Sequence, residues 1–242
     1  MTLSDKITKW IKDYAKEHKI KTLVVGISGG IDSAVVSTLC AKTGLPVYAV
    51  SMPIAQLSEQ HDLSIAHGEW LINKFMNVEH LIVDLDKTYD RFYLDMLHID
   101  MDNELALANT KSRLRMVTLH HISGANRGIV VGTGNKVEDF GVGFYTKYGD
   151  GGVDISPIAD LYKSEVWDLG RELGVMQEII DAEPTDGLWE DGRTDKDQLG
   201  GLTYEQMEEA MKDPNSKHRD KYNKIRSQNL HKMKPIPVYK NE

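Results

Sequence analysis

Several features that would indicate a secreted, membrane or nucleic-acid-binding protein are missing from this sequence. There is one cysteine, Cys40, so no internal disulfide can form. No window approaches the roughly 20 apolar residues of a membrane span, and residues 1–19 lack the apolar core of a secretory signal. Acidic residues outnumber basic ones by 37 to 29, which argues against a nucleic-acid-binding surface. We expect a cytoplasmic protein that binds neither membranes nor nucleic acids.

The sequence does contain enough apolar residues for one α/β domain. With 242 residues, 40% of them hydrophobic, the chain can bury a full core, and we expect residues 1–242 to form a single domain. Apolar runs alternate with helical patterns, giving expected strands at 22–27, 46–51, 79–85 and 128–131 and expected helices near 58–76, 88–98, 103–122 and 161–173. This alternation predicts βαβ units, and therefore a doubly wound parallel sheet flanked by helices.

An amphipathic helix is expected at the start of the chain. Apolar residues recur there at helical spacing, namely Ile7, Trp10, Ile11 and Tyr14. Ser4 or Asp5 is the expected first residue of this helix. Its apolar stripe would pack either against the core or against a partner subunit.

The segment Ser28-Gly29-Gly30-Ile31-Asp32-Ser33 follows the first expected strand and precedes a helical pattern. Two glycines let the backbone approach an anion, and the start of the next helix offers unpaired N–H groups. A carboxylate such as Asp32 would repel a phosphate unless a divalent cation lay between them. The loop therefore predicts a site for pyrophosphate with Mg²⁺.

The simpler alternative is a Gly-Gly turn in which Asp32 or Ser33 only caps a helix. The loop matches neither G-x-x-x-x-G-K-[ST] nor G-x-G-x-x-G, which argues against kinase-type and Rossmann nucleotide sites. It resembles the SGGxDS loop of the ATP pyrophosphatases, a superfamily whose members adenylylate a substrate and release pyrophosphate.

A second polar turn is expected beside this loop. It follows the strand that ends at Val131 and carries a hydroxyl at Thr133 and a carboxylate at Glu138. Ligands of open parallel sheets bind beyond the carboxyl ends of the strands, so both turns should face one cleft. Asp32 and Glu138 can then share one metal ion.

Residues 141–152 contain five glycines together with three aromatic residues, a lysine and an acid. Glycine at this density disfavours regular structure, so composition allows either a flexible surface loop or a lid over a ligand. The aromatic residues favour the lid, because their rings can stack on a nucleotide base. Further along, Lys163 lies in the first turn of an expected helix, where a cation is locally unfavourable and so should serve another purpose.

Taken together, the motifs resemble those of the NAD synthetase family. The matching residues are Ser28 to Ser33, Asn109-x-x-x-Arg113-x-x-Met116, Gly132-Thr133-x-Asn135-Lys136-x-Glu138, Phe144 to Gly152 with Asp154, Pro157-x-x-x-Leu161-x-Lys163 and Glu183-Pro184-Thr185. The resemblance extends from the first helix to His231-Lys232. The glycine-rich segment is the most specific of these blocks, because other ATP pyrophosphatases lack it.

The resemblance implies a reaction in two steps. The nicotinate carboxylate of deamido-NAD attacks the α-phosphate of ATP and releases pyrophosphate, and ammonia then displaces AMP to give NAD. By resemblance, Asp32 and Glu138 hold Mg²⁺ and Lys163 stabilises charge on the phosphates. The residues expected around ATP are Gly26, Ile27, Ser28, Gly29, Gly30, Ile31, Asp32, Ser33, Thr133, Lys163 and Thr185.

The resemblance also implies a deamido-NAD site formed by Asn109, Arg113, Lys147, Asp150, Asp154, His231 and Lys232. Asn109 and Arg113 are four residues apart, so on a helix they project from one face. An arginine at this position can bind a carboxylate or a phosphate of the ligand. Without the surrounding motif, the simpler interpretation of Arg113 is an exposed or ion-paired helix residue. Asp150 would either bind the substrate or deprotonate incoming ammonium.

Two departures from the family pattern affect these expectations. Ser51 stands where many relatives have an arginine, and residues 54–60 match poorly, which leaves the adenine contacts there open. One extra residue lies between Glu138 and Phe144 relative to some family members.

Three functions remain as alternatives: an ammonia-dependent NAD synthetase, another adenylylating pyrophosphatase that forms GMP or modifies tRNA, and a non-catalytic ATP-binding regulator. Acidic composition disfavours a tRNA platform, and a regulator would not need Asp32, Glu138 and Lys163 around the phosphates. A glutamine-using synthetase needs a further domain with a cysteine nucleophile, so free ammonia is the expected nitrogen donor. The resemblance implies a homodimer.

Overall fold

The computed structural model describes residues 1–54, 58–189 and 191–241, with the side chains of 58–60 left aside. The elements, in chain order, are α1 (Leu3–Glu17), β1 (Thr22–Gly26), α2 (Ile31–Lys42), β2 (Val47–Ser51), α3 (Ser58–Lys74), β3 (Val78–Ile82), α4 (Asp86–His98), α5 (Glu104–Ala125), β4 (Gly128–Val130), the π-helix η1 (Val137–Val142), α6 (Lys163–Leu173), α7 (Gln177–Asp181), α8 (Asp195–Gln198), α9 (Tyr204–Lys212) and α10 (Arg219–Met233). Among the described helices, none has both the length and the apolarity to cross a bilayer.

The strands form one parallel sheet in the order β3-β2-β1-β4, which confirms the predicted fold class. In register, Leu23 of β1 lies opposite Val47 of β2 and Ile129 of β4. Beyond β4, Val131 forms a parallel bridge with Ile155, which brings the chain after the glycine-rich segment back to the sheet. Because all strands run the same way, their carboxyl ends meet along one edge.

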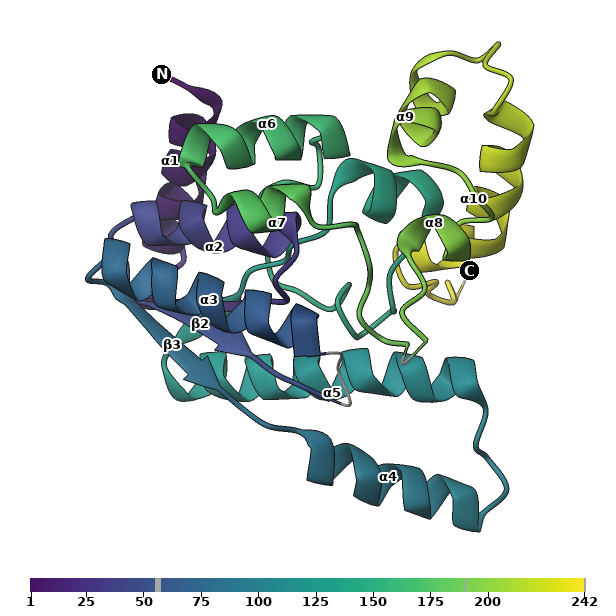
Figure 1. The fold of residues 1–242 in the computed structure, drawn as a ribbon, viewed down its shortest axis with the longest axis horizontal. Helices are drawn as coiled ribbons and strands as arrows, with labels where there is room; N and C mark the ends of the chain where they lie inside the picture. The colour runs from purple at the N-terminus through teal and green to yellow at the C-terminus, as the bar shows by residue number, and fades with distance from the viewer. Residues whose placement is uncertain (55–57, 190, 242) are drawn as a thin grey trace.

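Helices cover both faces of the sheet (Figure 1). Side chains of a strand alternate between faces, so Leu23 and Val25 join the core beneath α1, α2 and α6, whereas Val24 joins the core beneath α5. Both sides of β1 are therefore fully buried. A continuous apolar run in the sequence reflects this double burial.

A separate helical group, formed by η1, α9 and α10, lies to the side of the sheet (Figure 1). It has its own apolar core, which consists of Val137, Val142, Leu199, Leu202, Tyr204, Met207, Ala210 and Tyr222. Because η1 follows directly from the turn after β4, this core fixes the residues of that turn against the sheet edge.

Helix α1 packs part of its apolar stripe against the body of the protein, whereas Trp10 of that stripe is 47% exposed. Ile7, Ile11 and Ala15 are buried against the core shared with α2 and α6. The helix begins one residue before the expected position: Thr2 is its cap, and Asp5 completes a capping box with it.

Cys40 lies on α2 and is completely buried. Burial raises the pKa of its thiol, so it has the environment of an apolar core residue.

Candidate active site

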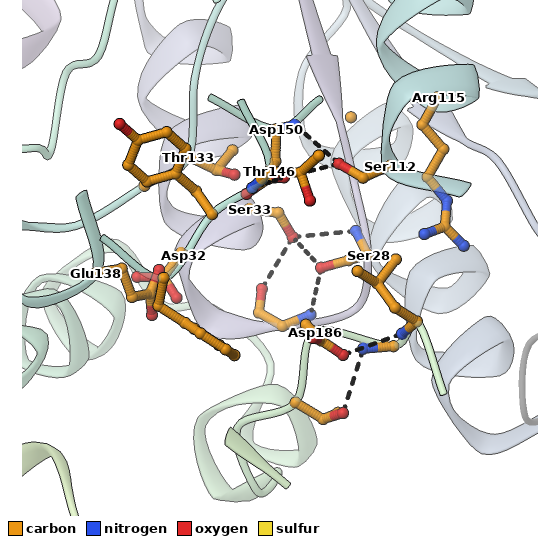
Figure 2. A pocket seen from close by; sticks show the side chains of 18 of the residues that line it. Ser28, Asp32, Ser33, Ser112, Arg115, Thr133, Glu138, Thr146, Asp150 and Asp186 are labelled. Atoms are coloured by element: carbon orange, nitrogen blue, oxygen red, sulfur yellow. Dashed lines mark hydrogen bonds between the residues drawn. The ribbon is translucent and has the colours of Figure 1, made fainter. Parts of the chain in front are cut away.

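The Ser28 loop connects β1 to α2 at the carboxyl edge of the sheet. Gly29 has a φ of +85°, a conformation that side chains other than glycine rarely adopt. The Ser33 hydroxyl accepts the Ser28 N–H at 3.1 Å and donates to the Gly30 carbonyl at 3.0 Å (Figure 2). Gly30 is the N-cap of α2 and provides no side-chain cap, so N–H groups at the start of this helix remain available to an anion.

Asp32 does not cap α2, which argues against the simpler interpretation of this loop. Its carboxylate instead accepts a hydrogen bond from the Lys163 ammonium and another, at 3.2 Å, from the Asn135 amide. Lys163 also donates to Glu138 Oε1 at 3.2 Å. The carboxylates of Asp32 and Glu138, from two strand ends, thus lie close together, as expected, and in this structure both contact the Lys163 ammonium.

Lys163 is 3% exposed and is the first residue of α6. Burial lowers the pKa of its ammonium, but the charges of Asp32 and Glu138 outweigh this effect and the net shift is upward. The ammonium is therefore charged at neutral pH. A cation interacts unfavourably with the N-terminal end of a helix, and the two carboxylates compensate for that interaction.

Tyr204 and Asp195 extend this group of polar side chains. The Tyr204 hydroxyl lies 2.6 Å from Glu138 Oε1 and 2.7 Å from Asp195 Oδ2. Asp195 is the first residue of α8, and burial, aided by the charge of Glu138, raises its pKa to about 7.

A π-helix occupies the position of the extra residue between Glu138 and Phe144. The i→i+5 hydrogen bonds of such helices enclose one residue more than those of an α-helix, and π-helices occur often at functional sites. Here η1 ends at Gly143, whose φ is +69°. It places both Glu138 and Asp139 on the cavity wall, and burial together with neighbouring carboxylates raises the pKa of Asp139 to about 8.

The glycine-rich segment is fixed to helix α5 by side-chain hydrogen bonds. The Ser112 hydroxyl donates to Asp150 Oδ1 at 2.7 Å and accepts the Asp150 N–H at 2.9 Å (Figure 2). The Thr146 hydroxyl donates a hydrogen bond to the Asn109 side chain, and the Thr146 N–H donates one to Asp150. A Cβ on Gly149 would lie 2.2 Å from the Ser112 hydroxyl, so glycine is required for this close approach. The segment is a built part of the site, not a free surface loop.

These elements enclose a cavity of about 500 Å³ at the carboxyl edge of the sheet. This volume is in the range of known small-molecule sites. Two of the three aromatic residues of the glycine-rich segment, Phe144 and Tyr145, line it, whereas Tyr148 is 61% exposed.

Comparison with known proteins identifies the family. The model of the NAD synthase family matches residues 3–240. The chain belongs to the NAD synthetase family.

Several relatives cover nearly the whole chain. The ammonia-dependent NAD synthetase of Finegoldia magna is 37% identical over 96% of this chain and 93% of its own length. That of Mesoplasma florum is 38% identical over 95% of this chain and 90% of its own. Among solved structures, an NMN synthetase from Francisella tularensis superposes with a TM-score of 0.89 at 32% identity, covering 98% of this chain and 97% of that one. An ammonia-dependent NAD synthetase from Campylobacter jejuni gives a TM-score of 0.75 at 27% identity, covering 98% and 97%.

Membership of the NAD synthetase family confirms the predicted class of enzyme, a ligase that forms a C–N bond. All residues expected around ATP line the large cavity, including Thr185 from the segment after α7. Of the residues expected to meet deamido-NAD, Asn109, Asp150 and Lys232 line it as well.

The other residues expected at the dinucleotide lie outside the cavity lining. Arg113 is exposed, and its Nε donates to the Lys147 carbonyl at 3.3 Å. His231 is also exposed. The Asp154 carboxylate accepts the Val130 N–H at 2.7 Å, so in this structure it holds the end of β4.

Several polar residues of this synthetase site were not predicted from the sequence, namely Ser112, Arg115, Asp139, Asp195 and Tyr204. Arg115 lies in the cavity wall (Figure 2), where its Nε donates to the Met52 carbonyl at 3.0 Å and its Nη2 is buried with no partner among the described residues. Burial lowers the pKa of this guanidinium to about 10. The sequence offered one signal for Arg115. It lies two residues after Arg113, so the two arginines face different directions on a helix, and only one of them can face a given ligand.

Ser51, at the position where the family resemblance led us to expect an arginine, is 1% exposed. Its hydroxyl lies 2.7 Å from the Ser64 hydroxyl and 2.9 Å from His80 Nε2. Ser64 in turn donates to the Ile27 carbonyl at 2.8 Å. Ser51 therefore supports the base of the Ser28 loop. Within the poorly matching segment 54–60, residues 55–57 lie outside the described residues, as do the side chains of 58–60.

Proposed function

We propose that the protein is an ammonia-dependent NAD synthetase that converts deamido-NAD, ATP and ammonia to NAD, AMP and pyrophosphate. The observation that carries this proposal is the meeting of the Ser28 loop, the Asp32–Lys163–Glu138 cluster and the glycine-rich segment around one cavity of about 500 Å³. We place the reaction in the cytoplasm, where ATP is available.

In the first step, the nicotinate carboxylate attacks the α-phosphate of ATP and pyrophosphate leaves. The N–H groups of the Ser28 loop and the start of α2 bind the departing phosphates. Lys163 turns from Asp32 and Glu138 toward the phosphates and stabilises their charge. No side-chain nucleophile is needed, since the main task of the protein is to align two anions and neutralise them.

The residues present fit a Mg²⁺ ion. Asp32 and Glu138 already direct oxygen atoms at one cation, the Lys163 ammonium, and carboxylate oxygens are the ligands that Mg²⁺ prefers. Asp32 and Glu138 are the residues that would hold it. When bound, the ion supplies positive charge to the leaving pyrophosphate.

In the second step, ammonia attacks the acyl carbon of the adenylate and AMP leaves. An ammonium ion must lose one proton before its nitrogen can attack, and the nitrogen loses another as the amide forms. Asp150 lies on the cavity wall with one oxygen held by Ser112 and Thr146, which orients the carboxylate for contact with substrate or ammonium.

Product analysis tests the proposed reaction. With ATP, Mg²⁺, deamido-NAD and ammonium chloride, we expect AMP, pyrophosphate and NAD in equal amounts. Without ammonium, the protein should still exchange labelled pyrophosphate into ATP, because the first step does not need a nitrogen source. Formation of ADP would contradict the mechanism.

The acceptor could also be a mononucleotide, and one observation favours this alternative. The structure superposes on the Francisella NMN synthetase with a TM-score of 0.89, against 0.75 for the Campylobacter NAD synthetase. A mononucleotide acceptor needs no site for the second nucleoside. The ratio of kcat/KM for deamido-NAD to that for nicotinate mononucleotide decides between them, and we expect deamido-NAD to be preferred.

We also propose a homodimer that forms through α4 and the start of α5. No residue of α4 is buried. Exposed apolar side chains continue from this helix through the connection to the start of α5, namely Leu94, Leu97, Ile99, Met101 and Leu105. Apolar patches of this kind are typical of protein interfaces. The same helix α5 carries Asn109 and Arg113, so a second copy would lie near the expected dinucleotide site.

Light scattering tests the dimer. We expect twice the chain mass for the unaltered protein and the single-chain mass for the Leu94→Glu/Leu97→Glu variant, since two charges in an apolar interface are costly. Val238→Glu, an equally polar change at an exposed residue of the C-terminal segment, is the control and should remain a dimer. A monomeric unaltered protein would contradict the proposal.

A further inference from the structure

A second, smaller cavity adjoins the large one. It has a volume of about 160 Å³ and lies between α6, α8 and α9. Glu183, Pro184 and Asp195 line both cavities, so the two meet at these residues. The volume of the smaller cavity equals that of about five water molecules, so a nucleotide does not fit in it.

Asp195 has an unsatisfied oxygen at this junction. The residue is 6% exposed, and its Oδ2 lies 2.7 Å from the Tyr204 hydroxyl. Its Oδ1 is buried and has no hydrogen-bond partner among the residues that the structure describes. Buried carboxylate oxygens almost always have a donor, so the site is short of one.

The Tyr204 hydroxyl, which contacts the other oxygen of Asp195, does not supply that donor. The Tyr204 hydroxyl carries one proton but faces two carboxylates, those of Asp195 and Glu138. The small cavity is lined by three carboxylates, with Glu183 and Glu205 beside Asp195, against one cation, Lys196. The rings of Trp167 and Tyr204 complete the wall, and aromatic faces also attract cations.

A small cation with hydrogen-bond donors fits these features. Mg²⁺ fits them poorly, because it requires near-octahedral oxygen ligands, and Asp195 offers one unpartnered oxygen here. Ammonium has four donors, little volume and one positive charge.

We propose that the small cavity binds ammonium, with Asp195 Oδ1 as its main acceptor, before the nitrogen passes to the large cavity. This inference rests on the proposed function, which consumes ammonia there. No bond is made or broken in the small cavity; the ion is held at Asp195, where the two cavities meet, until the adenylate has formed.

Steady-state kinetics of an Asp195→Asn variant test this site. The substitution keeps size and hydrogen bonding to Tyr204 but removes the negative charge. We expect the KM for ammonium chloride to rise about tenfold, as for loss of one charged hydrogen bond. The KM for ATP and the rate of ammonia-independent pyrophosphate exchange should stay unchanged, and kcat should recover at saturating ammonium.

Asp197→Asn is the matched control, because Asp197 lies on the same short helix but is exposed and lines neither cavity. It should leave all constants unchanged. Should Asp195→Asn fail to fold, Glu205→Gln tests the same site from an exposed residue of the small cavity, with an expected rise of a few fold in the KM for ammonium.

The possible outcomes are distinct. An unchanged KM for ammonium with normal exchange would overturn the inference and leave the proposed function intact. Loss of pyrophosphate exchange in folded Asp195→Asn would also overturn it, by assigning Asp195 to the ATP site. Absence of exchange and of NAD formation in the unaltered protein would overturn the proposed function and this inference together.

Discussion

The Asp32→Ala variant is expected to be folded and inactive. Asp32 lies in the first turn of α2 beside the phosphate loop, where its carboxylate is one of two that converge on a cation. Its loss removes a ligand for the proposed Mg²⁺, and we expect kcat/KM to fall by about 10³-fold or more. Glu138 remains as a partner for Lys163, so the free energy of unfolding should fall by only about 1 kcal/mol.

Measurements of pyrophosphate exchange and thermal unfolding check this expectation. Asp168→Ala is the control, since the Asp168 side chain is 80% exposed on α6 and forms only a surface pair with Arg171. Near-normal activity of Asp32→Ala would remove the metal role assigned to this residue.

Replacing Lys163 by methionine should affect both activity and stability. The variant loses the only ammonium that the described structure places between Asp32 and Glu138, and two carboxylates are left facing each other in a site with little solvent. Removing one partner of a buried ion pair typically costs about 3 kcal/mol of unfolding free energy. The proposed loss of charge stabilisation on the phosphates should lower kcat by about 10²-fold to 10³-fold.

The double variant Asp32→Asn/Lys163→Met separates these two effects. Because it removes one carboxylate as well as the ammonium, it should recover much of the stability lost in Lys163→Met while remaining inactive. Denaturation in urea and the exchange assay measure the two properties. Recovery of activity together with stability would show that Lys163 acts only on the fold.

The local parts of the site were predictable from the sequence. The Ser28 loop is a short segment between a strand and a helix, and its glycines, hydroxyls and carboxylate carry their own chemistry. Lys163 was noticeable because a lysine is unfavourable in the first turn of a helix. The sequence therefore pointed to both Asp32 and Lys163, but only the structure shows that Lys163 contacts Asp32 and Glu138.

The residues that were missed come together only through tertiary packing. Tyr204 reaches Glu138 across 66 residues of sequence, and nothing near either residue indicates the contact. Arg113 matched the family motif, yet Arg115, two residues further along α5, is the arginine that faces the cavity. The extra residue before Phe144 was visible, but a single insertion can enter a loop or a helix with equal ease, so the π-helix could not be foreseen.

The pairing of Lys163 with both Asp32 and Glu138 has a consequence for selectivity among cellular anions. A free phosphate ion can attract Lys163 only by leaving those two carboxylates without a counterion, and that separation opposes its binding. If Asp32 and Glu138 hold Mg²⁺ as proposed, a nucleotide that brings its own divalent cation would leave neither the carboxylates nor its phosphates without a counterion. We therefore expect the resting protein to discriminate against inorganic phosphate without any steric barrier.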